Sequence, residues 1–586
     1  MLVYALAMSY QSILCYDTFK ATAFDLGNMD QVLWNTLHGR PFQFTNQAID
    51  WYGPPTRLAI HFEPIILPLS LLYLFHADPR ILLVFQTLAL TSGALPVFLL
   101  TRKHLPRWPL LAAFMAGAYL LSPALLGLNI FDFHPVSLAT PLLLYAMLAL
   151  TYKRYVWFII ACIFAASCKE DVPLAIAMFG ILLIWKYKLP RLGTTLLVGG
   201  FLWSFLAFAV IIPHFYPGAQ QNNFWYRYEA LGSSPGAAIV NLIVHPWLLF
   251  TTFITLDRLY YLGDLFRSTG FLALLAPEWL LPALPSLAVN LLSTDPLLYS
   301  GVYHYNATII PFIMLSSIHG ARRLIMLWQE WRGENVPTEE DDKRSKTINV
   351  VAPLVGARLP LVGARQSTTR STVQSIAQST VQSIAYHLIA AFGHMVAMMR
   401  TRLSSFMRSI QQRLVRFARR SVQWERFNER MVALAKSISL PRLQWVLFAW
   451  ITIMLVINFM IATPRLNAFW ADHQPGSREQ HIQQLLDMIP PDASISAGSN
   501  LNPHLSERQY LAVFPSICMN TSCSATAQYI IVDLNAVLPE DRTETTSELN
   551  QLVHSGQFRV LARAEGVVLL VATSRVLRGG IREQGP

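Results

Sequence analysis

Apolar runs close to the length needed to cross a membrane recur along the first 330 residues of this sequence. Spanning the hydrocarbon core takes about 20 mostly apolar residues in a helix. Only 13% of the 586 residues are charged, against about 25% in ordinary globular domains. The predicted spans lie at 1–15, 80–101, 108–129, 136–151, 155–168, 171–187, 192–213, 238–256, 269–293, 307–327 and 443–463.

The sequence therefore predicts an all-α polytopic membrane domain, with about 11 or 12 transmembrane helices and covering residues 1–330. Residues 58–77 either span or re-enter, because this run is short and contains Pro64 and Pro68. No A-x-A-like cleavage site follows the first apolar run, so we expect no cleaved signal peptide. That run also lacks flanking charge, so the sequence does not establish whether Met1 is the true N-terminus of the protein.

Short basic segments follow alternate spans and predict the orientation. Loops rich in Lys and Arg stay in the cytoplasm. The basic segments are "RKHLPR" (102–107), "YKR" (152–154), "KYKLPR" (186–191) and "ARR" (321–323). This pattern predicts a multi-pass protein of the cell membrane, with 328–442 in the cytoplasm and 464–586 outside. The alternation holds if 58–77 does not cross or if the N-terminus lies outside.

Residues 331–386 are predicted to be a disordered, low-complexity cytoplasmic insert. They contain an acidic cluster (339–342) and two short duplications. "LVGAR" occurs at 354–358 and 361–365, and "STVQSIA" at 371–377 and 379–385. Units this short are typical of recent duplication, because a solenoid repeat needs a longer unit.

Residues 387–442 carry most of the net positive charge, with eleven Lys and Arg against two acidic residues. A net charge of +11 on the whole chain can indicate nucleic-acid binding, but this excess lies beside the predicted span 443–463. Basic segments there attract anionic membrane lipid, so we predict no nucleic-acid partner. Apolar residues recur every three or four positions, which predicts a basic amphipathic helix: Leu403, Met407, Ile410, Leu414 and Phe417. It either lies on the inner leaflet or packs on the membrane domain.

The chain turns polar after residue 464. "ASISAG", "QYIIVDL" and "FRVLARAEGVVLLVA" are typical of strands, and "REQHIQQLLDMI" of a helix. These segments predict a small extracytoplasmic α/β domain over 464–586. In an oxidising compartment Cys518 and Cys523 can form a disulfide. Two free thiols are the alternative, and no second Cys/His pair with zinc spacing follows.

A polar stretch, "TAFDLGNMDQVLWNTLHGRPF" (22–42), follows the first apolar run directly. Asn28 is a predicted N-cap, with Gln31 in the capping-box position. Gly39 and Pro41 end the predicted helix. The stretch thus predicts a short amphipathic helix at the outer surface, and Asp25 and Asp30 lie near its start.

Four other polar clusters fall at the same predicted end of the membrane domain. They are "RLAIHFEP" (57–64), "FDFHP" (131–135), "CKED" (168–171) and "STDPLLYSGVYHYN" (293–306). Ionisable side chains near a membrane core are costly, so their concentration indicates a functional site. A single interfacial Asp or His more often caps a helix or contacts solvent, and Lys169 can simply pair with Glu170 and Asp171. Convergence of five clusters on one face favours a site.

The strings "FDLGNMDQVLWNTLHGRPF", "HFEPIILPLSLLYLF", "FDFHP" and "KED" closely resemble a bacterial and archaeal multi-pass membrane family known as a domain of unknown function. The resemblance covers residues 10 to about 325 and 480–575, and leaves 334–442 peculiar to this chain. That family in turn resembles the GT-C membrane glycosyltransferases. These enzymes transfer sugars from polyprenyl-phosphate donors outside the membrane and place a catalytic Asp in the first outer loop.

This resemblance implies a glycosyltransferase that moves a sugar from a lipid-linked donor to an unspecified acceptor on the extracytoplasmic face. It implies Asp25 as catalytic base, with Asp30 as the alternative. The predicted substrate- and phosphate-binding side chains are Lys169, Arg57, Arg227, His61, Glu63, Glu170, Asp171 and His304. Asp132 and His134 would orient the acceptor or hold a divalent cation, Mg²⁺ or Mn²⁺.

Two other classes of protein fit the composition. A transporter or lipid-handling protein without chemistry is the main alternative, but such proteins tend to show midplane polar residues and repeated groups of spans. A sensor or scaffold built on the outer domain would leave the five clusters unexplained. P-loop and GxGxxG motifs are absent, which disfavours binding of a soluble nucleotide.

Overall fold

The computed structural model describes residues 1–46, 55–216, 224–334, 422–519 and 523–573. The chain divides into two compact units. The first comprises Met1–Leu324 and Gln444–Pro586, and the second comprises Ile325–Leu443.

The membrane part of the first unit is helical, as predicted. Its longer helices are α1 (Leu2–Asp17), α2 (Asn28–Leu37), α5 (Pro79–Ser92), α6 (Ala94–His104), α7 (Pro109–Leu120), α8 (Pro123–Ile130), α9 (Ala139–Thr151), α10 (Tyr155–Ala166), α11 (Val172–Trp185), α12 (Pro190–Leu206), α14 (Pro235–Val244), α16 (Leu256–Arg267), α17 (Leu284–Leu291) and α18 (Ile310–Trp331). Prolines start many of them, because the first helical position needs no N–H and favours the fixed φ of proline. At α5 the preceding Asp78 also accepts a hydrogen bond from Arg80 N, at 2.7 Å.

Short helical turns connect these helices and carry much of the polar sequence. The short α-helices are α4 (Ile66–Ser70), α13 (Ile212–Phe215) and α15 (Leu248–Phe253). Two turns are π-helical, η1 (Ala23–Gly27) and η5 (Ala207–Ile211). The 3₁₀ turns are η2 (Arg57–Ala59), η3 (Leu71–Leu74), η4 (Pro135–Leu138), η6 (Trp225–Leu231), η7 (Leu272–Leu275), η8 (Pro277–Ala283), η9 (Pro296–Tyr299), η10 (His304–Asn306) and η12 (Asn502–Leu505).

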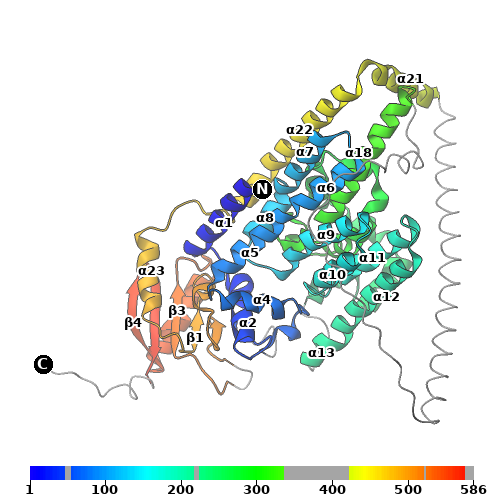
Figure 1. Ribbon diagram of the computed structural model, residues 1–586. Helices are drawn as coiled ribbons and strands as arrows, with labels where there is room; N and C mark the ends of the chain where they lie inside the picture. Colours follow the sequence, from blue (N-terminus) through cyan, green and yellow to red (C-terminus); the bar gives the residue numbers. More distant parts are fainter. Residues whose placement is uncertain (47–54, 217–223, 335–421, 520–522, 574–586) are drawn as a thin grey trace, which may run out of the picture. The chain divides into compact units, whose positions relative to one another are not determined.

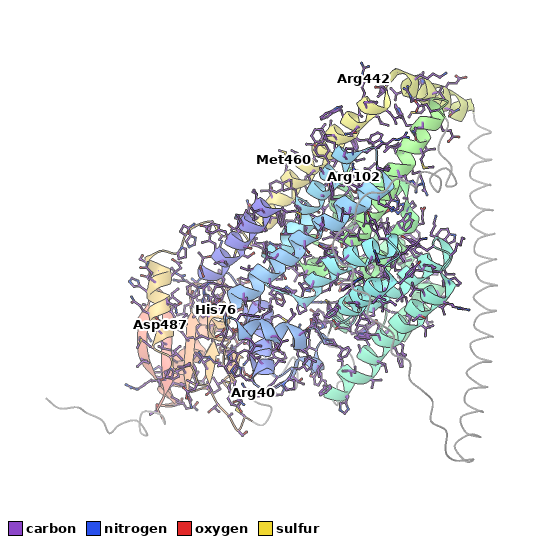
Figure 2. The ribbon with its side chains drawn as sticks, viewed as in Figure 1. Arg40, His76, Arg102, Arg442, Met460 and Asp487 are labelled. Atoms are coloured by element: carbon purple, nitrogen blue, oxygen red, sulfur yellow. A yellow bond between two sulfur atoms is a disulfide. The ribbon has the colours of Figure 1, made fainter. Side chains whose placement is uncertain are left out.

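Within the described residues, four helical segments are long and apolar enough to cross a membrane. They are Pro79–His104, Pro190–Phe215, Ile310–Trp331 and Leu440–Leu466. A fifth would be the pair α7 and α8, which is bent by 44°. Figure 2 shows His76 and Arg102 towards opposite ends of the first of these segments, so its basic end lies far from the polar turn that precedes it.

Three predicted spans are not continuous helices, and the first of them, 108–129, is the bent pair α7 and α8. The prediction of one span at 238–256 is wrong, because α14 ends at Val244 and α15 begins at Leu248. The prediction at 269–293 is also wrong, since η7, η8 and α17 divide it. Prolines explain the second break, because they remove backbone donors inside a helix. Residues 58–77 contain only η2, α4 and η3, each too short to cross.

The predicted C-terminal α/β domain is confirmed. Its sheet has the order β2-β1-β3-β5-β4, with strands β1 (Ile495–Ala497), β2 (Leu511–Val513), β3 (Tyr529–Asp533), β4 (Phe558–Ala564) and β5 (Val567–Ala572). β1 pairs in parallel with β2 and β3, whereas β5 runs antiparallel to β3 and β4. The sequence did not predict β2 or the helix α24 (Arg542–His554).

Two apolar clusters form the core of this domain. α23 (Ser477–Asp487) contributes Ile482 and Leu485 to the first cluster, together with Ile495 and Leu569 of the sheet. α24 contributes Leu549 to the second. Because alternate side chains of a strand point to opposite faces, the two helices cover opposite faces of the sheet. Figure 1 shows α23 beside the strands.

The second unit joins the end of α18 to α21 (Val422–Ser437) and the start of α22 (Leu440–Leu466). Arg332 donates hydrogen bonds to the carbonyl oxygens of Ala435, at 2.9 Å, and Ile438, at 2.8 Å. α22 matches the predicted last span, 443–463. Most of the predicted insert and the predicted amphipathic segment from Leu403 to Phe417 lie outside the described residues.

Candidate functional site

The polar stretch at 22–42 begins with the π-helical turn η1, which carries Asp25, and continues directly into α2. The predicted capping box is wrong. Gly27 before α2 is already helical, with φ −60° and ψ −42°, so Asn28 lies inside a continuous helical stretch. Its Nδ2 donates to Phe24 O at 3.0 Å. Gln31 Oε1 instead accepts from the backbone of residues 45 and 46.

α2 is not the predicted surface helix, because it is buried on polar and apolar sides alike. Asp30 is fully buried and accepts hydrogen bonds from Tyr73 Oη and, at 2.6 Å, from Ser506 Oγ of the C-terminal domain. Burial raises the pKa of Asp30, and the nearby Glu507 raises it further. Asp30 therefore joins the membrane part to the C-terminal domain.

Asp25 lies in a different environment, although it is only five residues away. His134 Nε2 lies 2.8 Å from Asp25 Oδ1, and the Asp25 side chain is 24% exposed. Thr22 Oγ1 lies 3.2 Å from the other oxygen of Asp25 and 3.1 Å from Asp132 Oδ2. The Thr22 hydroxyl thus lies between the two carboxylates. Asp25 combines a fixed imidazole partner with access from outside.

Gln86 of α5 holds the loop that presents Asp132 and His134. Gln86 Nε2 donates to Asp132 O at 2.8 Å, and Gln86 Oε1 accepts from His134 N at 3.0 Å. Asp132 has φ +44°, an unfavourable left-handed conformation that this clamp supports. Burial raises the pKa of Asp132 to about 7, with a further contribution from the charge of Asp25.

His304 of η10 stacks on His134, with ring centroids 4.0 Å apart. Both Nδ1 atoms are buried and have no hydrogen-bond partner in the described part of the chain. Burial lowers the pKa of His304, and the nearby His134 and Lys169 lower it further. His304 therefore favours the neutral imidazole, and it contacts both His134 and the ring of Tyr305.

Glu170 anchors the turn between α10 and α11. His61 Nδ1 lies 2.8 Å from Glu170 Oε1, and Phe62 N donates to Glu170 Oε2 at 3.1 Å. Ser204 Oγ of α12 donates to Glu170 O at 2.7 Å. Burial alone would raise the pKa of Glu170, but the charge and hydrogen bond of His61, with Lys169, lower it to about 2.

Lys169 has no hydrogen bond or ion pair among the described residues, although it is half-buried. Burial lowers the pKa of Lys169, but Asp171 and Glu170 outweigh it and raise the pKa above its ordinary value. Asp171 Oδ1 is buried and also lacks a hydrogen-bond partner among the described residues. Lys169 thus favours the charged ammonium, and no described residue accepts a hydrogen bond from it.

The other predicted cations already have partners. Arg57 makes two hydrogen bonds to Glu63, at 2.7 and 3.2 Å, and both side chains are buried. Arg227 pairs with Asp295 at 3.1 Å. Its guanidinium lies 5.9 Å from the ring centroid of Tyr305, and the Tyr305 ring lies 4.3 Å from that of His304. Arg227 therefore borders the same cluster, whereas Arg57 stabilises its loop.

The structure thus brings Asp25, Asp132, His134, His304 and Lys169 into one cluster of loops at helix ends, and it places Asp30 outside it. No group of three His, Cys, Asp or Glu side chains in the described ranges is arranged to hold a metal ion. The divalent cation at Asp132 and His134 stays a prediction. Cys518 and Cys523 form a disulfide in the C-terminal domain.

Sequence reasoning missed Thr22 and Gln86. Thr22 has no distinctive pattern around it. Gln86 had a usable signal, because it is a fully buried amide in the middle of an apolar span, and intramembrane polar residues are rarely without a function.

One family model matches residues 15–352 and 370–569, and its description is "Predicted membrane protein (DUF2079)". The chain belongs to this family. The match corrects the prediction that 334–442 is peculiar to this chain, because family members share most of that segment. Only 353–369 is unmatched within it, and this piece contains both copies of "LVGAR".

Two solved structures of ArnT from Cupriavidus metallidurans are similar to this chain over nearly its whole length. One is bound to undecaprenyl phosphate and covers 97% of each chain, and the other is in the apo state and covers 98% of each. Both show 12% sequence identity and a TM-score of 0.39, which transfers no residue role to this chain. No curated protein matches the sequence.

Proposed function

We propose that this membrane protein is a glycosyltransferase that moves a sugar from a polyprenyl-phosphate donor to an acceptor hydroxyl. One observation carries the proposal. A partly exposed carboxylate, Asp25, is held by His134 and the stacked His304, and the charge of Lys169, which has no hydrogen bond or ion pair among the described residues, acts on His304. A base and a cation in one cluster are what transfer from a phosphate leaving group requires.

Each step has a candidate side chain. Asp25 takes the proton from the acceptor hydroxyl while that oxygen forms a bond to the anomeric carbon of the sugar. The bond from this carbon to the phosphate oxygen breaks, and polyprenyl phosphate leaves. Lys169 neutralises the departing phosphate, with Arg227 beside it. His134 orients Asp25 through its Nε2–H, and Asp132 fixes the position of Thr22.

The orientation forms part of the proposal. The site lies at the ends of helices opposite to the basic segments at 102–107, 152–154 and 186–191, so the positive-inside rule places the site and the C-terminal domain outside the cytoplasm. Protease added to intact cells should then cut within 464–586. Cleavage within 328–442 instead would reverse the orientation and remove access to an outer-leaflet donor.

The decisive experiment uses purified full-length protein in lipid nanodiscs with a radiolabelled polyprenyl-phosphate sugar. Consumption of the donor and release of polyprenyl phosphate are expected for wild type and not for Asp25→Asn. Binding of polyprenyl phosphate with no transfer to any acceptor would favour the lipid-handling alternative. A protein that binds no polyprenyl phosphate, yet moves a solute across vesicles, would overturn the glycosyltransferase assignment.

A further inference from the structure

The turn that carries Asp25 depends on the C-terminal domain for its hydrogen bonds. Ala23 N, the first amide of η1, donates to Ser499 Oγ at 3.3 Å. Ala23 O accepts from Asn46 Nδ2 at 3.1 Å. Asn46 is in turn fixed by Asn502, because the two amides exchange hydrogen bonds of 2.7 and 2.5 Å. Ser499 and Asn502, with which these hydrogen bonds begin and end, both belong to the C-terminal domain.

Gly27 shows how closely the domain approaches the turn. Its φ of −60° suits any residue, so no backbone conformation requires glycine here. A Cβ at Gly27 would collide with Asn502 Oδ1 and would lie 3.0 Å from Asn46 Nδ2. Glycine therefore serves close approach, and the approaching group is the same Asn502 that fixes Asn46.

α2 adds a second set of contacts just after the turn. Gln31 Nε2 donates to Arg508 O at 3.1 Å, and Gln31 Oε1 accepts from the backbone amides of Thr45 and Asn46. Thr45 Oγ1 also accepts from Leu511 N of β2 at 2.9 Å. The segment 45–46 is thus held between α2 and the sheet, which fixes the Asn46 amide that contacts the turn.

Ser499 lies just after β1, at the carboxyl end of a parallel strand, and Asn502 starts the turn η12 that follows. Side chains at this edge are placed by the backbone of the sheet rather than by a mobile loop, and open α/β sheets commonly carry functional groups there. Here the carboxyl edge of β1 meets the turn of Asp25. The rigid sheet can therefore fix the position of a carboxylate on a short irregular turn.

We propose that the C-terminal α/β domain is a positioning part of the active site, in which Ser499 and Asn502 hold the η1 turn so that Asp25 has its working geometry. This inference rests on the proposed glycosyl transfer. It assigns to the domain a role in setting the rate of reaction rather than in binding a separate partner. A misplacement of about 1 Å can cost about 100-fold in rate, so small contacts at the turn matter.

The test compares Asn502→Ala and Ser499→Ala with Asn500→Ala in the full-length protein. Asn500 belongs to the same loop, but its Nδ2 donates within the domain to Asp533 Oδ2, at 3.0 Å, and so provides a matched control. Hydrogen–deuterium exchange of residues 22–28 is measured beside kcat and KM for donor turnover. Ser499→Ala removes only one hydrogen-bond acceptor and should preserve folding. It therefore remains a valid test if Asn502→Ala does not fold.

Both test variants should speed exchange in 22–28 by about 2- to 10-fold. They should lower kcat by about 10- to 100-fold with KM nearly unchanged. Asn500→Ala should leave all three quantities unchanged. Unchanged exchange in both test variants, or equal effects from Asn500→Ala, would overturn the positioning role. If wild type transfers no sugar, the proposed function fails, and exchange still decides whether the domain holds the turn.

Discussion

Asp25 and Asp30 are five residues apart on one polar stretch, yet they lie in contrasting regions of the molecule. Asp30 is fully buried between the membrane part and the C-terminal domain, where Tyr73 and Ser506 occupy its oxygens. Asp25 is partly exposed and touches His134, beside imidazole nitrogens without hydrogen-bond partners among the described residues.

The difference separates structural polar groups from reactive ones. Buried polar groups that stabilise a fold have their hydrogen bonds satisfied, because an unmade buried hydrogen bond is costly. The two oxygens of Asp30 follow this rule, because Tyr73 and Ser506 donate to them. Around Asp25, the buried Nδ1 atoms of His134 and His304 have no hydrogen-bond partner among the described residues, and the proposed function assigns such atoms to substrate contacts. Each prediction below tests one side of this contrast.

The largest expected effect is on the reactive side. Asp25→Asn should lower sugar transfer by about 10²–10⁴-fold, because the amide cannot take a proton from the acceptor. The melting temperature should stay near that of wild type, since Asp25 is partly exposed. Asp30→Asn serves as the matched control, and it should retain transfer per folded molecule. Equal losses of transfer in the two variants would remove the distinction between the two carboxylates.

Lys169→Gln should weaken binding of polyprenyl phosphate by about 10- to 100-fold, the value of a charge-assisted hydrogen bond. Scintillation binding measures the affinity of the purified variant for polyprenyl phosphate. Thermal melting measures its stability separately. Arg57→Gln is the control, because Arg57 is already paired with Glu63 and its loss should destabilise the protein by about 3–5 kcal/mol. A destabilised Lys169→Gln with normal lipid binding would assign Lys169 to a local pair with Glu170 or Asp171.

Asp30→Asn should lower the free energy of unfolding by about 1–3 kcal/mol, because the amide nitrogen replaces one of the two oxygens that accept from Tyr73 and Ser506. Chemical denaturation in detergent measures this loss. Ser506→Ala in the Asp30→Asn background should cost less than in wild type, since both changes break one contact. Additive losses would show that Asp30 and Ser506 stabilise the protein independently.

The smallest effect concerns pH at the same interface. Burial raises the pKa of Glu507 to about 7, and Asp78 adds to the shift. Because the folded-state pKa exceeds that of the unfolded chain, Glu507 favours folding at low pH, and this contribution is lost as the pH rises from about 4 to about 7. Glu507→Gln should therefore reduce the loss of melting temperature between pH 5 and 8, by about 2–4 °C.

Glu540→Gln, an exposed site in the same domain, provides the control for this measurement. Asp30 contributes a slope of the same sign, so Glu507→Gln should reduce the pH dependence without removing it. An identical slope in Glu507→Gln and wild type would mean that the interface does not respond to the protonation of Glu507.

Some features of this protein follow from the sequence alone. Apolar length predicts the spanning helices at 79–104, 190–215, 310–331 and 440–466, because the bilayer fixes the length of a helix that crosses it. Short apolar segments bounded by turn residues predict β1, β3, β4 and β5, since a strand buried on both faces reads as a continuous apolar run. Polar residues at helix ends also predict which loops meet at the site.

Tertiary structure alone decided what each polar residue does. The local pattern predicted a capping role for Gln31, but Gln31 contacts residues 45, 46 and 508. Asp25 and Asp30 look alike in sequence, and only the approach of His134 to one and of Ser506 to the other separates them. Hydrogen bonds between residues more than 100 positions apart leave no periodicity in the sequence, because they depend on how distant segments pack.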